Sequence, residues 1–99
     1  MLKKQFLKTK KECKVTFTLQ NIEAETVALV GQFNNWDQTA HPMKRTKDGS
    51  FSVTVNLPKG EEFEFRYFVN GEEWHNDTEA DKYVPNQYGE MNSVVITSE

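Results

Sequence analysis

The side chains best suited to acid–base chemistry are three carboxylates in one polar segment, Asp77, Glu79 and Asp81. Paired carboxylates hydrolyse glycosidic bonds when one is protonated to act as the acid and the other is ionised. Their pKa values separate in this way only where the two surroundings differ and exclude water, which an acidic, turn-rich segment rarely achieves. We therefore interpret the segment as a solvated loop and predict no hydrolysis or glycosyl transfer.

Other reactive residues are few and scattered. His41 and His75 stand alone, without the spacing of zinc ligands. Cys13 is the one cysteine, so an intrachain disulfide is excluded and a reducing compartment fits. A glycine-rich phosphate loop between a strand and a helix is also missing from the sequence. We predict that the protein is not an enzyme and has no metal and no cofactor.

Aromatic residues in turn-rich segments indicate binding instead. Trp36 directly follows a predicted strand, Trp74 follows the Asn70-Gly71 turn, and Tyr88 lies beside Gly89. The apolar C–H groups of a pyranose ring can lie against the face of an indole, while polar side chains bind the hydroxyls. Three aromatic rings in three loops favour a sugar-binding face. The alternative is that each tryptophan only packs against its own loop.

The strands that must position these rings are predicted by alternating apolar and polar residues, and helical periodicity is nearly absent. Tight turns at 47–50, 57–60 and 70–71 separate the runs. Short strands with regular turns predict an all-β protein, an immunoglobulin-like antiparallel β-sandwich. A polar loop with one helical turn is expected over 78–89. The expected strands cover 15–19, 26–31, 51–57, 62–69 and 93–97, with a weaker strand at 5–9 and a brief one at 73–74.

Length and charge narrow the class of partner. Ninety-nine residues are enough for one core, so we expect a single domain over 1–99. The formal net charge of −3 argues against nucleic-acid binding. Six of the twelve basic residues lie in the first fourteen positions, which we interpret as a solvated strand, with an anion-binding arm as the alternative. Neither a membrane span nor a signal peptide is evident, so we expect a cytoplasmic protein.

Four ordered motifs resemble those of the glycogen-binding carbohydrate-binding modules. Residues 27–36 resemble the family's "V-x-G-x-F-N-x-W" signature, 65–71 its "Y-K/R-F-x-V-D-G" strand, 74–77 its "W-x-x-D" turn and 86–95 its closing "G-x-x-N-x-V" strand. The family includes the β-subunit module of AMP-activated protein kinase and the N-terminal early-set domains of isoamylases and branching enzymes. The resemblance runs from about residue 15 to 99 and implies an early-set sandwich that binds α-1,4-glucan.

The resemblance also implies which residues contact the sugar. Trp36 and Trp74 match the two stacking tryptophans, and Arg66 matches the basic residue that bonds glucose hydroxyls. Tyr88 matches an apolar residue that reaches across the glucan, and Asn92 matches an asparagine that bonds the sugar. From the residues alone, alternatives stay open: Arg66 could pair with a neighbouring carboxylate, Glu64 or Glu73, and Asn92 could only stabilise its turn.

Two departures from the family pattern are expected to alter affinity or chain-length preference. Glu90 replaces a small hydroxyl residue, and Glu72-Glu73 adds one residue before Trp74. The function we predict is non-catalytic binding of α-1,4-linked glucan (glycogen, starch or maltooligosaccharide) by stacking on an aromatic platform. The alternative is a protein-interaction module of the same fold that docks onto a glucan-metabolising enzyme or a kinase.

Overall fold

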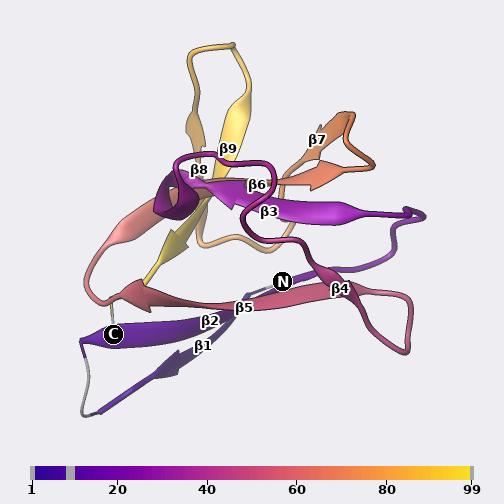
Figure 1. Ribbon diagram of the computed structural model, residues 1–99. Coiled ribbons are helices and arrows are strands. Elements are labelled where there is room, and N and C mark those ends of the chain that lie inside the picture. Colours follow the sequence, from indigo (N-terminus) through magenta and orange to yellow (C-terminus); the bar gives the residue numbers. More distant parts are fainter. Residues whose placement is uncertain (1, 9–10, 99) are drawn as a thin grey trace.

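The computed structural model describes residues 2–8 and 11–98, and its regular elements are strands apart from one 3₁₀ turn (Figure 1). The five longer predicted strands are confirmed within one or two residues at most ends. The elements are β1 (Leu2–Phe6), β2 (Glu12–Leu19), β3 (Val27–Gly31), η1 (Gln32–Asn34), β4 (Lys44–Arg45), β5 (Phe51–Pro58), β6 (Glu62–Val69), β7 (Glu73–His75), β8 (Lys82–Pro85) and β9 (Met91–Ile96).

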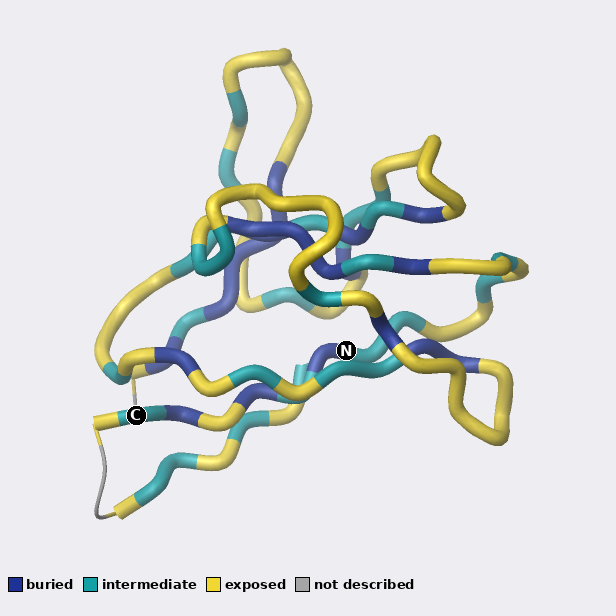
Figure 2. Tube along the Cα trace, in the orientation of Figure 1, coloured by how far each residue is buried: buried dark blue, intermediate teal, exposed yellow. Residues whose placement is uncertain are grey.

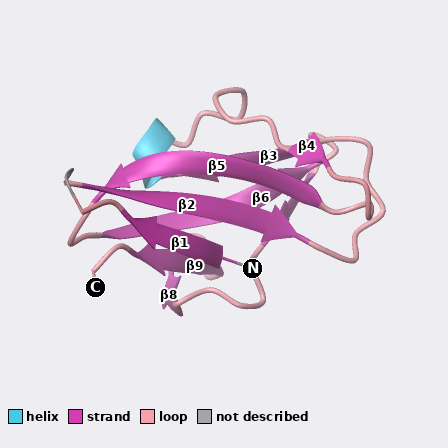
Figure 3. Cartoon of the chain, turned by 90° about the horizontal axis from the view of Figure 1, so that it is seen from below, coloured by secondary structure: helices cyan, strands magenta, loops and turns pink. Residues whose placement is uncertain are grey.

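Two antiparallel sheets form the layers of the molecule. One has the strand order β1-β2-β5-β4, and the other has the order β3-β6-β9-β8, with β7 added beside β6. The strands of one sheet lie over those of the other (Figure 3). This confirms the predicted all-β, immunoglobulin-like early-set sandwich.

Side chains from both sheets fill the space between them, because apolar residues alternate with polar ones along the strands. Figure 2 shows buried and exposed positions following one another along the strands. Phe17 of β2 meets Phe65 of β6 edge-on, with ring centroids 5.0 Å apart, and Phe65 meets Tyr67 at 5.7 Å. Aromatic pairs in this geometry add to the stabilisation from burial alone. The inward face of β6 is therefore fixed in the core, and its outward face is free to carry polar residues.

The segment expected to be a loop with a helical turn contains a strand instead. β8 pairs with β9, from Lys82 opposite Val94 to Pro85 opposite Met91. Pro85 is compatible with this position because β8 lies at the edge of its sheet. The 3₁₀ turn lies at η1, directly after β3. The first strand was also misplaced: it is β1, it ends at Phe6, and the predicted end at Thr9 lies outside the described residues.

One carboxylate of the acidic segment is buried, which corrects the solvated-loop interpretation. Asp77 is 1% exposed and accepts a hydrogen bond from the Tyr67 hydroxyl at 2.7 Å and another from the Glu79 N–H at 2.7 Å. Its own N–H donates to Ser93 Oγ at 2.9 Å. The carboxylate is buried because these partners replace water. Asp77 therefore anchors the chain just after β7, the strand that carries Trp74.

The basic first strand is only partly solvated. Lys3 and Lys14 are exposed, but Lys4 pairs with Asp81 at 2.6 Å. This ion pair joins β1 of one sheet to the segment that enters β8 of the other sheet. Lys10 lies outside the described residues.

Candidate functional site

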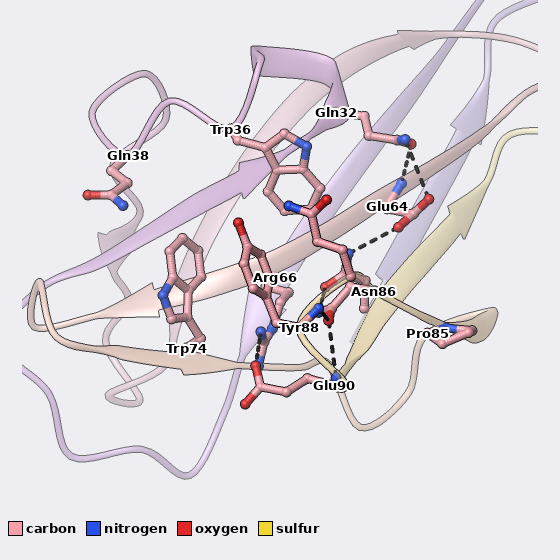
Figure 4. A pocket seen from close by; sticks show the side chains of 12 residues that line it. Gln32, Trp36, Gln38, Glu64, Arg66, Trp74, Pro85, Asn86, Tyr88 and Glu90 are labelled. Atoms are coloured by element: carbon pink, nitrogen blue, oxygen red, sulfur yellow. Dashed lines mark hydrogen bonds and ion pairs between the residues drawn. The ribbon is translucent and has the colours of Figure 1, made fainter.

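All five residues predicted to contact sugar line one groove on the outer side of the second sheet (Figure 4). The groove has a volume of about 860 Å³. Its walls come from the segment after β3, the outward face of β6, β7 and the β8–β9 connection. Its lining residues are Gln32, Trp36, Gln38, Glu64, Arg66, Trp74, Pro85, Asn86, Gln87, Tyr88, Glu90 and Asn92.

Trp36 is presented by a tightly bonded turn. The Asn34 side chain accepts a hydrogen bond from the Gly31 N–H at 3.0 Å and donates one to the Leu29 carbonyl at 3.0 Å. The Trp36 N–H donates to the Gly31 carbonyl at 2.9 Å, and Phe33 packs inward against core rings. Trp36 adopts φ +58°, which few non-glycine residues do. The turn thus holds the indole over the groove, with 38% of the residue exposed.

Gly31 lets this turn sit close to β6. Its backbone is extended, so the requirement is for space: a Cβ there would lie 2.6 Å from the Glu64 carbonyl oxygen and 2.9 Å from Phe65 Cβ. Both distances are shorter than side-chain carbons tolerate. The glycine and asparagine of the 27–36 motif therefore have structural roles, and together they set the position of Trp36.

Trp74 is held by contacts with Phe68 and Arg66, both on β6. It lies opposite Phe68 in the β6–β7 pair, with ring centroids 4.4 Å apart. The guanidinium carbon of Arg66 lies 5.9 Å from the centre of the Trp74 ring, within reach of a cation–π interaction. The predicted turn at Asn70-Gly71 is confirmed, with both residues at positive φ. Trp74, like Trp36, is 38% exposed.

Arg66 lies on the groove floor and pairs with neither of the carboxylates considered from the sequence. Its Nη1 donates to Glu90 Oε1 at 2.9 Å. The Arg66 side chain is 13% exposed and that of Glu90 is 61% exposed, so the pair runs from the floor to the rim. Among residues 2–8 and 11–98, none offers an acceptor to the buried Arg66 Nε. Glu90, which departs from the family pattern, thus forms an ion pair with Arg66, the basic residue of the site.

Tyr88 is the most exposed aromatic residue of the groove, at 78%. Asn86 shapes its loop: Asn86 Oδ1 accepts the N–H of Tyr88 at 2.9 Å and that of Glu90 at 3.1 Å. Figure 4 shows Tyr88, Trp36 and Trp74 around the same opening. The three aromatic residues predicted from separate segments are therefore brought together.

Asn92 is nearly buried below this opening, with 6% exposed. Its Nδ2 donates to Glu64 Oε1 at 3.0 Å, and its Oδ1 accepts from Asn86 Nδ2 at 3.1 Å. Sequence reasoning missed Glu64 and Asn86 as parts of the site. A signal for Glu64 existed, since alternation along β6 places it on the same face as Arg66.

The groove offers ring faces and hydrogen-bonding groups rather than a reactive centre. Its two carboxylates, Glu64 and Glu90, are engaged by Asn92 and Arg66 respectively. In the described part of the chain, no group of three or more His, Cys, Asp or Glu residues could hold a metal ion. No helix among the same residues is long and apolar enough to cross a membrane. A polyhydroxylated ligand fits this chemistry, because it has both apolar ring faces and hydroxyls.

A β-sandwich with such a groove fits the class of carbohydrate-binding modules. Residues 13–99 match the family model described as the glycogen recognition site of AMP-activated protein kinase, and the chain belongs to this family. The family is one of non-catalytic, carbohydrate-binding domains. Carbohydrate binding is therefore the function at the level of this family.

Three curated relatives are 1,4-α-glucan branching enzymes, each far longer than this chain. Identity is 56% over 32 residues with the enzyme of Aspergillus oryzae, covering 32% of this chain and 5% of that enzyme. Identity is 48% over 40 residues with the enzyme of Saccharomyces cerevisiae, covering 38% of this chain and 6% of that enzyme. Identity is 29% over 83 residues with the enzyme of Photobacterium profundum, covering 82% of this chain and 12% of that enzyme. The chain thus matches only a small part of each relative.

Proposed function

We propose that this chain binds α-1,4-linked glucan (glycogen, starch or maltooligosaccharide) without acting on it. The observation that carries the proposal is the meeting of Trp36, Trp74 and Tyr88 around one groove. Membership of a glycogen-recognition family and the branching-enzyme relatives support an α-glucan as the ligand.

In this proposal Trp36 and Trp74 each stack against a glucose ring, and Tyr88 contacts a further part of the glucan. Both tryptophans keep about two-fifths of their surface exposed; Trp74 packs against Phe68, and the backbone of Trp36 is held by its hydrogen bond to Gly31. A ring that is already fixed loses little conformational entropy when the ligand arrives. Stacking on such rings favours a chain of several glucose units over a single sugar.

Arg66 and Asn92 supply hydrogen bonds to hydroxyls from the floor of the groove. Arg66 reaches the sugar through guanidinium donors that Glu90 does not use, or by exchanging Glu90 for a hydroxyl. Asn92 has both amide atoms engaged but keeps one unused N–H and one unused lone pair. Hydrogen bonds of this kind orient the glucan, while the rings supply most of the contact area.

Native electrophoresis in gels cast with and without glycogen tests the proposal. The protein should be retarded by glycogen, and Trp36→Ala and Trp74→Ala should each migrate as if glycogen were absent. Met91→Ala is the control, because Met91 has a similar exposure of 43% but does not line the groove. An unretarded wild-type protein would contradict the proposal and favour the docking module.

A further inference from the structure

Tyr88 stands on an exposed connection, and its position depends on its loop. The β8–β9 connection extends away from the sandwich (Figure 1). An aromatic ring that moves freely must be ordered when a ligand binds, which lowers affinity. A pre-formed site therefore needs something that fixes the loop from below.

A continuous series of hydrogen bonds connects that loop to the sheet; two of its members, Glu64 and Asn86, are labelled in Figure 4. Glu64 on β6 accepts from Asn92 Nδ2 at 3.0 Å, and Asn92 Oδ1 accepts from Asn86 Nδ2 at 3.1 Å. Asn86 Oδ1 then accepts the N–H groups of Tyr88 and Glu90. We call these residues, Glu64, Asn92 and Asn86, the polar chain.

The direction of every bond in the polar chain is set by Glu64. An ionised carboxylate can only accept hydrogen bonds, so Asn92 must turn its NH₂ group toward it. The Asn92 oxygen then faces Asn86, which must turn its own NH₂ group toward Asn92. This leaves the Asn86 oxygen facing the loop, where the two backbone N–H groups need an acceptor. One carboxylate thus orients two amides and, through them, the backbone of Tyr88.

The polar chain also reaches the segment before Trp36. Gln32 Oε1 accepts from the Glu64 N–H at 2.8 Å, and Gln32 Nε2 lies 3.5 Å from Glu64 Oε2. Gln32 is the first residue of η1, the turn that leads to Trp36. Glu64 therefore contacts both the turn that leads to Trp36 and, through Asn92 and Asn86, the loop that carries Tyr88.

We propose that Glu64 is a positioning residue that fixes the Tyr88 loop through Asn92 and Asn86. The polar chain is largely shielded, since Asn92 is 6% exposed and both Glu64 and Asn86 are half-buried. The inference rests on the proposed function where it concerns affinity, but the ordering of the loop is independent of any ligand.

Amide hydrogen exchange tests the ordering of the loop without a ligand. Glu64→Ala should speed exchange at the Tyr88 and Glu90 amides several-fold, because Asn86 is then no longer held in the orientation that accepts them. The matched control is Glu62→Ala, two residues along the same strand, which removes an exposed ion pair with Lys82 at 2.6 Å. Unchanged exchange at both amides in Glu64→Ala would overturn the proposal, whether or not the protein binds glucan.

A double-mutant cycle with maltoheptaose tests the effect on binding. Glu64→Ala alone should weaken binding roughly two- to tenfold, the range of one lost hydrogen bond. In the Tyr88→Ala background the same change should cost clearly less, since the part of its effect that passes through the Tyr88 loop is already lost. An equal cost in both backgrounds would overturn the proposal, because it would mean that Glu64 does not act through the Tyr88 loop.

A conservative variant, Glu64→Gln, tests whether Glu64 acts by accepting a hydrogen bond from Asn92 or by its negative charge. Glu64→Gln keeps an oxygen that accepts from Asn92, so it should retain slow exchange at the Tyr88 amide and most of the wild-type affinity. Rapid exchange in Glu64→Gln, equal to that in Glu64→Ala, would overturn the hydrogen-bond account. Thermal unfolding of each variant, followed by circular dichroism, verifies that the compared proteins are folded.

Discussion

The Oε1 atom of Glu90 accepts a hydrogen bond from Arg66 Nη1 at 2.9 Å, from the rim of the groove to its floor. The basic group of the site therefore has an anionic partner before any ligand arrives. A hydroxyl that takes the same N–H group must displace a charged acceptor, which forms the stronger hydrogen bond. The ion pair thus opposes the hydrogen bond that Arg66 is proposed to make.

Replacing Glu90 by serine should raise the affinity for maltoheptaose by roughly two- to tenfold, the value of one hydrogen bond gained. Asn86 would still hold the loop through the backbone N–H groups. Isothermal titration calorimetry gives the affinity. Glu73→Ser is the matched control, because Glu73 pairs with His75 outside the groove lining and has a similar side-chain exposure. Weaker binding by folded Glu90→Ser would contradict the claim that Glu90 and the sugar hydroxyl compete for Arg66.

The backbone at Trp36 should make glycine a better replacement than alanine for stability. At φ +58° an alanine is strained by about 1 kcal/mol, while glycine is not. We expect Trp36→Gly to be more stable than Trp36→Ala by about that amount in urea unfolding, with neither variant binding glucan. Equal unfolding free energies would show that the turn relaxes when the indole is removed.

A methyl group at Gly31 should destabilise the fold by its collision with the Glu64 carbonyl oxygen and Phe65 Cβ of β6. The expected cost of Gly31→Ala is about 1–3 kcal/mol or more, as for overpacked sites. The comparison is Gly49→Ala, where space is open and only φ +85° opposes a side chain, at about 1 kcal/mol. Denaturant unfolding measures both. A smaller loss in Gly31→Ala than in Gly49→Ala would contradict the tight approach of β3 to β6.

The buried pair of Tyr67 and Asp77 should make stability fall in alkali. Burial, and then the nearby carboxylate, raise the pKa of Tyr67 well above its ordinary value. The folded protein keeps this proton above about pH 10, whereas the unfolded chain releases it. The free energy of unfolding should therefore fall as pH rises beyond 10, by up to about 1.4 kcal/mol per pH unit from this group.

Tyr67→Phe isolates the pH-dependent contribution, since it removes the titrating hydroxyl. It also removes the hydrogen bond to Asp77, which lowers stability at both pH values, so the slope with pH is compared and not the absolute stability. Between pH 10 and 11 the unfolding free energy of the variant should decline less steeply than that of the wild type, measured with urea at each pH. Parallel declines in the two proteins would show that Tyr67 does not keep its proton in the folded state.

The sandwich was predictable because burial alternates along its long strands. Phe63, Phe65 and Tyr67 signal one face of β6 by their spacing alone. β8 was missed because it is only four residues long, ends in Pro85, and is a strand through its pairing with β9. The burial of Asp77 was missed for a similar reason, since Asp77 lies in a loop and its partner Tyr67 lies ten residues away on β6.

The aromatic part of the groove was also predictable, because Trp36, Trp74 and Tyr88 each lie in a segment with a family motif or turn signal. The polar part was not. The Arg66–Glu90 pair joins residues 24 positions apart, and the Asn92–Glu64 bond joins residues 28 positions apart. Such contacts depend on the register of β6 with β9 and on the shape of the β8–β9 loop. Each contact joins segments far apart in the chain, so the sequence around one residue does not identify its partner.

Affinity as a function of glucan length tests the central claim most directly. Tryptophan fluorescence is titrated with glucose, maltotriose and maltoheptaose at two ionic strengths. Binding should strengthen from glucose to maltoheptaose, reach roughly millimolar to tens of micromolar dissociation constants, and change little with salt because the ligand is neutral. Equal affinity for glucose and maltoheptaose, or no response to any of them, would contradict a glucan-binding platform of Trp36, Trp74 and Tyr88.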